Sequence, residues 1–484
     1  MTTGIFSFIF SITLSRSLGA EGMGLYNLVM PIYNLFICVM SAGMVAAISK
    51  ISAIYYENKD YKNLYKTIKT TLGFNLIWSV AVAFSVFFLN DFLAVSIVKD
   101  LRASAALKII CPAMIFITLS NIFKGYFYGI SRVMIPAVID IFEKGIRISI
   151  ILLLLTIFKS DSMNTRLAVS YSALCVGEFI SLFLLYIYYR ENRKKNIQNH
   201  HLPVEGRAQL LYNVLAVSVP LCINGVITNI LSTASALIVP RRLAAAGIEY
   251  STALSLIGKF SGMAMTIVFF PMVIIGSINT ILIPDLSKSI SKKDYHSSEK
   301  RIKDVLKLSF LLGICTIMIC ITIPDSLGLM IFKRRDLGQY IRFAAYSSPL
   351  YYASVTTYGI LNGMGKHHIL LRNSMVISVI EIIILFYLTS IPTINIYGYG
   401  ITLIITSFLS VAANILEIKK SFQLTISSGN VLIYSLFTFL LYYILNIVYK
   451  ILPDYLFLLK TYSVILISFS LFIFAIYYTK KISQ

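Results

Sequence analysis

The chain consists of long apolar runs separated by short polar segments rich in lysine and arginine. A membrane-spanning helix needs roughly 20 apolar residues, whereas a barrel strand needs only about 9 to 11. Fourteen runs fit helices better than strands, at residues 4–18, 25–49, 71–93, 104–123, 133–158, 167–189, 209–239, 252–283, 305–324, 339–361, 373–391, 398–417, 429–449 and 455–478. The pattern predicts an all-α polytopic membrane protein with about fourteen transmembrane helices.

A polar motif occurs twice, at equivalent points of this pattern. Lys-Asp-Tyr at 59–61, followed by Ile-Lys at 68–69, recurs 234 residues later at 293–295 and 302–303. The same offset relates Gly129 to Gly363, and the first hairpins of the two halves match at an offset of 225. Chance matching among lysine-rich loops is the alternative, but the shared register favours a duplicated chain, which is typical of transporters.

The runs fall into groups of six, six and two. We expect an N-terminal lobe at 1–189, a basic cytoplasmic linker at 190–208, a C-terminal lobe at 209–420, and an extra helix pair with a cytoplasmic tail at 421–484. Because each half has an even number of spans, the two six-helix lobes are expected to be pseudo-symmetric about an axis along the membrane normal, with a cleft between them. The first span is short, so we expect a truncated first helix.

Basic residues are distributed unevenly between the two sides of the membrane. When the loops are sorted onto alternate sides, 25 of the 42 lysines and arginines fall on one side and 12 on the other. The richer side is predicted to be cytoplasmic, together with both termini. The net charge of +21 follows from this bias and does not require a nucleic acid partner. Residues 59–72 form an amphipathic pattern typical of an interfacial helix on anionic membrane lipids.

Charged residues inside spans are the candidates for chemistry, because each costs about 2.5 to 3.5 kcal/mol to insert. Glu143 and Arg147 lie one helical turn apart in the fifth span and are able to pair. Glu178, Lys259 and Glu381 are the other deep candidates. For the first pair, an ion pair that only holds helices together is an equal and compatible alternative to a cavity role.

Motifs of several other function classes are missing from the sequence. It has no phosphate-binding Gly-x-x-x-x-Gly-Lys-Ser/Thr loop, no His-Glu-x-x-His and no nucleophile elbow. The six cysteines lie in predicted spans without paired metal-ligand spacing. We therefore expect no enzyme, no catalytic residues, no cofactor and no metal site.

Two stretches carry a family resemblance. The segment 14–26, Leu-Ser-Arg-Ser-Leu-Gly-Ala-Glu-Gly-Met-Gly-Leu-Tyr, and the segment 124–147, from Lys-Gly-Tyr-Phe-Tyr-Gly to Glu143 and Arg147, resemble the stage V sporulation protein B family. That family belongs to the multidrug/oligosaccharidyl-lipid/polysaccharide (MOP) exporter superfamily, whose layout of six, six and two helices matches throughout. Carried over by position, the residues that match the family's are Arg16, Lys124, Glu143, Arg147 and Glu178.

The resemblance implies a flippase for a lipid-linked cell-wall precursor similar to lipid II, acting by alternating access in the cell membrane and connected with sporulation. It also implies a cationic cavity between the lobes and a groove beside the last two helices for a polyprenyl tail. Ser11 and Gly225 stand where relatives often carry arginine, so the substrate is expected to differ or activity to be reduced. The rivals are a cation-coupled multidrug exporter of this fold and a non-transporting scaffold that contacts cell-wall synthesis proteins.

Overall fold

The computed structural model describes residues 2–157, 163–195, 205–422, 428–452 and 457–482. All regular structure in these residues is helical, which confirms the predicted all-α class. Parts of the predicted linker (196–204) and of the C-terminal segment (423–427, 453–456 and 483–484) lie outside the described residues.

Packing divides the chain into two compact units. The first unit contains residues 2–18 and 25–237, and the second contains residues 19–24 and 238–484. The first unit is built from α1 (Thr2–Ser41), α2 (Met44–Glu57), α3 (Tyr61–Phe88), α4 (Asn90–Phe92), the π-helix η1 (Leu93–Val98), α5 (Arg102–Gly129), α6 (Met134–Ile157), α7 (Met163–Lys195) and most of α8 (Arg207–Ala245). The predicted lobes remain a prediction, because these units group residues by packing and not by the sequence repeat.

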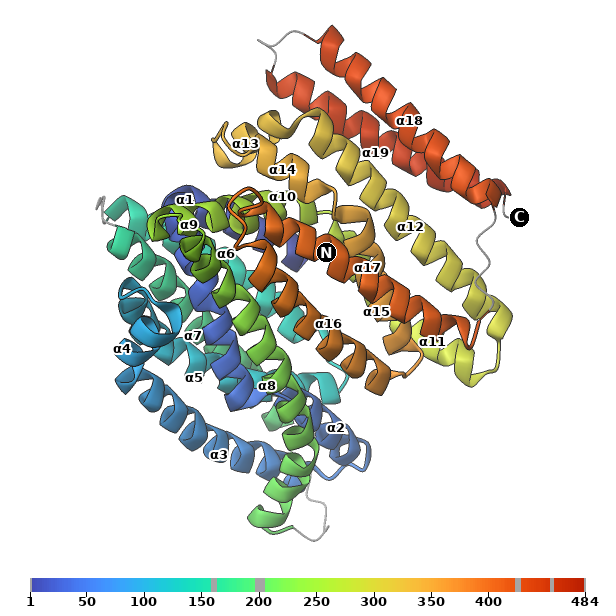
Figure 1. Cartoon of the computed structure of the whole chain (residues 1–484). Helices are drawn as coiled ribbons and strands as arrows, with labels where there is room; N and C mark the ends of the chain where they lie inside the picture. The colour runs from blue at the N-terminus through green and yellow to red at the C-terminus, as the bar shows by residue number, and fades with distance from the viewer. Residues whose placement is uncertain (1, 158–162, 196–204, 423–427, 453–456, 483–484) are drawn as a thin grey trace. The chain divides into compact units, whose positions relative to one another are not determined.

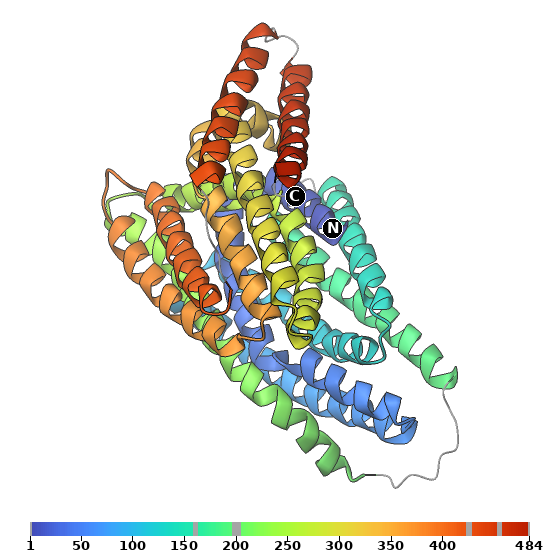
Figure 2. The ribbon, with the colours of Figure 1, turned by 90° about the vertical axis from the view of Figure 1, so that its right-hand side faces the viewer.

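The second unit contains the remaining helices (Figure 1). They are α9 (Tyr250–Ile257), the π-helix η2 (Gly258–Ala264), α10 (Met265–Phe269), α11 (Met272–Ser291), α12 (Tyr295–Thr322), α13 (Pro324–Phe332), α14 (Gly338–Ala345), α15 (Ser348–Gly363), α16 (His367–Leu388), α17 (Tyr397–Lys419), α18 (Ser428–Ile451) and α19 (Phe457–Ile482). The last two helices run side by side in both ribbon views (Figures 1 and 2).

Eleven helices in the described residues are long and apolar enough to cross a membrane. This number differs from the fourteen sequence runs because breaks redistribute them. The runs 4–18 and 25–49 join within one kinked segment, 2–57, and the run 252–283 is interrupted before α11. Helix α6 is not counted because four charged residues interrupt its apolar sequence: Asp140, Glu143, Lys144 and Arg147.

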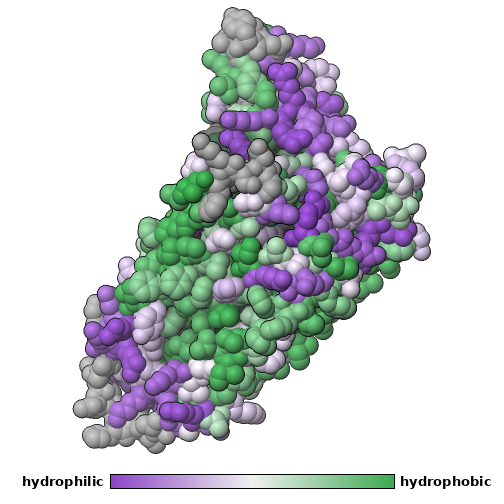
Figure 3. Space-filling view, turned by 90° about the vertical axis from the view of Figure 1, so that its left-hand side faces the viewer, coloured by the Kyte–Doolittle hydropathy of each residue, from purple (hydrophilic) through white to green (hydrophobic). Residues whose placement is uncertain are grey.

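Exposed apolar residues are abundant on the described surface. Large side chains such as Ile77, Phe88 and Met134 are more than half exposed, in a chain whose helices leave little polar surface between their ends. The face drawn in Figure 3 carries a broad continuous region of hydrophobic residues. A soluble protein rarely exposes such a patch, so lipid is the solvent for this multi-pass protein.

The repeated Lys-Asp-Tyr motif adopts the same local structure twice. Lys59 and Lys293 are both left-handed, with φ of 57° and 59°. The following aspartates, Asp60 and Asp294, each accept a hydrogen bond from the backbone N–H three residues later, at 3.1 Å in both cases. Each motif therefore ends one helix and caps the N-terminus of the next.

The glycine pairs near the ends of α5 and α15 also repeat at an offset of 234. A Cβ added to Gly129 would meet the backbone of Ser49 in α2, and one added to Gly363 would meet the backbone of Ile283 in α11. Ser49 and Ile283 are themselves 234 residues apart. The same helix-to-helix approach is thus built twice, which is the local structure that a duplicated sequence predicts.

The predicted interfacial helix at 59–72 is wrong in one respect. Leu64 and Ile68 are completely buried in a core cluster with residues of α2 and α5, including Tyr126. The apolar face of this segment therefore packs against protein and not against a lipid surface. Its amphipathic pattern is the ordinary signature of a helix that packs on neighbouring helices.

Candidate functional site

A buried cluster of charges joins α6 to α7. The four-residue spacing of Glu143 and Arg147 places both on one face of α6, where their side chains form an ion pair. Nη2 of Arg147 also donates a hydrogen bond to Oε1 of Glu178 in α7, at 3.0 Å. The three side chains are at most 13% exposed, so one guanidinium is held between two carboxylates away from solvent.

Gly177 makes this arrangement sterically feasible. A Cβ at this position of α7 would lie 2.8 Å from Oε1 of Glu143 and 3.3 Å from Nε of Arg147. The missing side chain lets the ion pair of α6 lie directly against the backbone of α7. The pair Gly177-Glu178 in the sequence therefore supplies both the space and the second carboxylate.

Aromatic side chains enclose the cluster. The ring of Phe10 faces the guanidinium carbon of Arg147, which is 5.5 Å from its centroid. Tyr26 stacks on Tyr171 with 5.4 Å between ring centroids, and Tyr26 and Tyr33 interact electrostatically with Arg147. Water is therefore excluded from the cluster on the side of these rings, which strengthens each charge interaction inside it.

A second ion pair lies between α5 and α6. Nζ of Lys124 is 2.7 Å from Oδ1 of Asp140, and Lys124 also interacts electrostatically with Glu178. The two pairs together contain two cations and three carboxylates. This group of charges is therefore not electropositive in its fully ionised form, although the family resemblance implies a cationic cavity.

The remaining predicted site residues do not join this cluster. Arg16 is in the first unit, whereas Lys259 and Glu381 belong to the second. Lys259 pairs with Asp336 at 2.8 Å, in the segment between α13 and α14. Asp336 also accepts hydrogen bonds from Arg334, which hold the pKa of its carboxyl well below the ordinary value.

The two positions that lack arginine differ in their surroundings. A Cβ at Gly225 in α8 would lie 2.7 Å from Sγ of Cys38 in α1, so these helices meet there and leave no room for a longer side chain. Ser11 lies on α1 and is partly buried. The glycine at 225 is thus a close-packing residue of the first unit as well as a lost cation.

Sequence reasoning did not select Asp140, Phe10 or Tyr26 as site residues. Asp140 was detectable, because it stands one turn before Lys144 and three residues before Glu143 in a span where any charge is costly. The two aromatic residues gave no signal, because aromatic side chains are common in every span of this chain. Their role depends on which helices pack together.

The sequence profile of the polysaccharide biosynthesis protein family matches residues 1–290, which is more than half of the chain. The chain belongs to this family. A curated relative is stage V sporulation protein B of Bacillus subtilis (strain 168), 23% identical over 427 residues that cover 88% of this chain and 82% of the relative. Lipid II flippase MurJ of the same organism is 26% identical over 204 residues, or 39% of this chain and 37% of the relative.

Solved structures of the MOP superfamily share the fold of this family member. The inward closed conformation of lipid II flippase MurJ matches with a TM-score of 0.73 at 15% identity, covering 99% of this chain and 98% of the other. An inward-facing multidrug resistance MATE family transporter matches with a TM-score of 0.68 at 12% identity, covering 87% and 94%. These likenesses confirm the predicted MOP fold.

Proposed function

We propose that this protein is a flippase that moves a lipid-linked polyprenyl diphosphate precursor of cell-wall or polysaccharide synthesis across the cytoplasmic membrane by alternating access. The observation that carries the proposal is the match over most of the chain to stage V sporulation protein B and over part of it to a lipid II flippase. The fold, shared over nearly the whole chain with a lipid II flippase, supports it.

Arg147 is the residue that we propose to contact the diphosphate. Its guanidinium offers five N–H donors, of which the carboxylates of Glu143 and Glu178 engage only some, and its Nε has no hydrogen-bond partner. A diphosphate competes for the same donors, so its binding exchanges one set of oxygen acceptors for another. Lys124 and Arg16 are proposed to assist as further cations of the first unit.

The membrane potential is the proposed energy source. A diphosphate that carries about two negative charges gains on the order of 4 to 5 kcal/mol on leaving a cell that is 100 mV negative inside. We also propose that both termini are cytoplasmic, since the lysine-rich loops then face the cytoplasm. Flipping that continues unchanged in vesicles after the potential is collapsed contradicts this energy source.

A second candidate function is favoured by the excess of carboxylates in the cluster. Three carboxylates beside two cations are a composition that can take up a proton or a metal cation, as a cation-coupled exporter of small molecules requires. The two functions differ in what drives transport. A proton or sodium gradient drives the exporter, whereas the potential alone drives the flippase.

The experiment is to measure exposure of labelled lipid II on the outer surface of cells depleted of their own flippase. Expression of this chain is expected to restore exposure, and the Arg147→Ala variant is expected to lower it at least about 10-fold, because a charge-assisted contact is worth 1.5 to 3 kcal/mol. The matched control is Arg166→Ala, which removes an arginine whose Nη1 instead bonds the backbone oxygen of Ser17.

Three results are distinguishable. Restored exposure that depends on Arg147 supports the flippase. No exposure, but efflux of cationic drugs that collapses with a proton or sodium gradient, supports the exporter instead. Normal wall growth without either transport activity supports a scaffold, and it overturns both transport proposals.

A further inference from the structure

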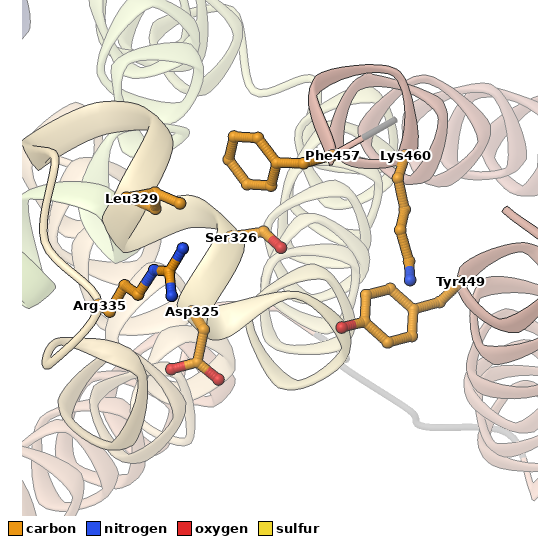
Figure 4. A pocket seen from close by; sticks show the side chains of 7 residues that line it. All are labelled: Asp325, Ser326, Leu329, Arg335, Tyr449, Phe457 and Lys460. Atoms are coloured by element: carbon orange, nitrogen blue, oxygen red, sulfur yellow. The ribbon is translucent and has the colours of Figure 1, made fainter. Parts of the chain in front are cut away.

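A cavity of about 290 Å³ lies in the second unit, between α13 and the terminal helix pair. Figure 4 shows the side chains that line it. They come from α13, the segment that follows it, the end of α18 and the start of α19: Asp325, Ser326, Leu329, Arg335, Tyr449, Phe457 and Lys460. None of them belongs to the charge cluster of α6 and α7.

Lys460 is the unusual member of this set. Its side chain is only 6% exposed although it carries a charge, and its Nζ lies 3.7 Å from the centroid of the Tyr449 ring. Burying a lysine is costly unless its charge is compensated, and a cation over an aromatic ring compensates part of the cost. In Figure 4 the ammonium end of Lys460 points toward Tyr449 and the space beside it.

The lining combines the groups that recognise an anionic headgroup bearing hydroxyls. Lys460 and Arg335 supply two cations, whereas Asp325 is the single acid. Two cations and one carboxylate match a phosphate that carries one negative charge, with the carboxylate and Ser326 left to bond hydroxyl groups. A diphosphate carries more negative charge than this set neutralises.

The position of the cavity suits a lipid. Tyr449 lies close to the end of α18, at Ile451, and Phe457 begins α19. Aromatic and lysine side chains near the ends of membrane helices lie at the depth of lipid headgroups. By the distribution of basic residues, the segments between α13 and α14 and between α18 and α19 both fall on the side predicted to be extracellular.

We propose that this cavity binds the headgroup of a phospholipid with one phosphodiester and free hydroxyls, of the phosphatidylglycerol class, from the outer leaflet. Arg335 and Lys460 hold the phosphate, Asp325 and Ser326 accept and donate hydrogen bonds to the glycerol hydroxyls, and Leu329 and Phe457 contact the start of the acyl chains. The lipid then joins α13 to the terminal pair, which has no counterpart in the sequence repeat.

This inference goes beyond the proposed transport function and does not depend on it. The probe is phosphatidylglycerol added to the purified full-length chain in detergent, with the bound lipid counted by native mass spectrometry. We expect saturable binding of one molecule at this site, with affinity reduced about 10-fold by Arg335→Gln and by Lys460→Gln, because each removes a charge-assisted hydrogen bond to phosphate. Arg335 is exposed, so its variant keeps the fold.

The matched control is Lys450→Gln, which removes an exposed cation next to Tyr449 in sequence but outside the lining. Its affinity is expected to change by less than about two-fold, as for a rim charge screened by solvent. Equal losses in Lys450→Gln and Arg335→Gln overturn the proposal, because they indicate attraction by surface charge alone.

Two further probes distinguish the source of the phosphate. Phosphatidylcholine shares the phosphodiester but lacks hydroxyls, and equal binding of it overturns the assignment of Asp325 and Ser326. Inorganic phosphate that displaces phosphatidylglycerol at equal concentration overturns the assignment to a lipid. A polyprenyl diphosphate that binds more tightly than phosphatidylglycerol overturns the charge argument.

Discussion

At the scale of the residue, Arg147 stabilises the first unit because it neutralises two buried carboxylates. Removing one partner of a buried ionic group leaves the others uncompensated, which costs about 3 to 5 kcal/mol. We therefore predict that Arg147→Gln lowers the free energy of unfolding by about this amount, measured by thermal unfolding in detergent. Neither Glu143 nor Glu178 has another cation at comparable distance among the ion pairs of the described residues.

A compensating variant separates stability from transport. Replacing both carboxylates as well, in the triple variant Glu143→Gln, Arg147→Gln and Glu178→Gln, is expected to recover most of the lost stability, because no buried charge then remains unpaired. Transport is expected to stay lost in the triple variant. Recovery of transport together with stability contradicts a substrate role for Arg147.

Gly177 is the second position where a single residue decides the site. The Gly177→Ala variant is expected to be less stable by about 1 to 3 kcal/mol, because its Cβ overlaps Glu143 and forces α6 away from α7. The matched control is Gly73→Ala in α3, where a Cβ meets nothing within 4 Å and the change is expected to stabilise slightly. A thermal unfolding midpoint of Gly177→Ala equal to that of wild type refutes the packing argument.

At the scale of the element, the duplicated chain reuses its helix boundaries. A further ion pair shows this: Asp100 pairs with Arg102, and 234 residues later Arg334 pairs with Asp336, both at 2.7 Å. The two partners have exchanged positions. The geometry of the segment is thus kept while the identity of each charge is free to change, because an ion pair at this spacing is symmetric in its partners.

The two aspartate caps are expected to stabilise their helices unequally. Asp60 also accepts a hydrogen bond from Nδ2 of Asn63 at 2.7 Å and is nearly buried, whereas Asp294 is exposed. We predict that Asp294→Ala costs about 1 kcal/mol of unfolding free energy and Asp60→Ala up to about 2 kcal/mol, measured by chemical denaturation. The control Asp294→Asn is expected to cost little, because asparagine caps equally well.

At the scale of the whole molecule, acid is expected to weaken the contact between Asp336 and its two cations. The pKa of Asp336 is held below its ordinary value of 3.8, chiefly by hydrogen bonds from Arg334. Its contribution to stability is therefore complete above that value and is lost as the pH falls toward the lower folded pKa. We predict that the gap in unfolding midpoint between wild type and Asp336→Asn is present at pH 7 and shrinks below about pH 4.

The proposed orientation is also tested on the whole molecule. Single cysteines replacing Lys293 and Lys333 in a cysteine-free background are exposed to a membrane-impermeant thiol reagent in intact cells. The cysteine at 333 is expected to react and the one at 293 to be protected, because loops rich in lysine and arginine remain in the cytoplasm. Reaction at 293 alone inverts the proposed topology and with it the direction of transport.

The sequence by itself determined the class of fold, the approximate helices, the repeated turns and the pairing of Glu143 with Arg147. These features depend on local periodicity, on capping residues and on the spacing of charges within one helix, all of which are written in the order of residues. The family also followed from sequence, because its segments at 14–26 and 124–147 are contiguous.

Only the tertiary structure decided that Glu178 completes the cluster, that Gly177 and Phe10 enclose it, and that the face at 59–72 is buried. It also decided that Lys259 pairs with Asp336 and that Lys460 lies beside α13. The physical reason is that a hydrophobic pattern states which face of a helix avoids water but does not state whether lipid or another helix covers it. In a chain this apolar, that choice depends on close packing between helices, and packing is a property of residues far apart in the sequence.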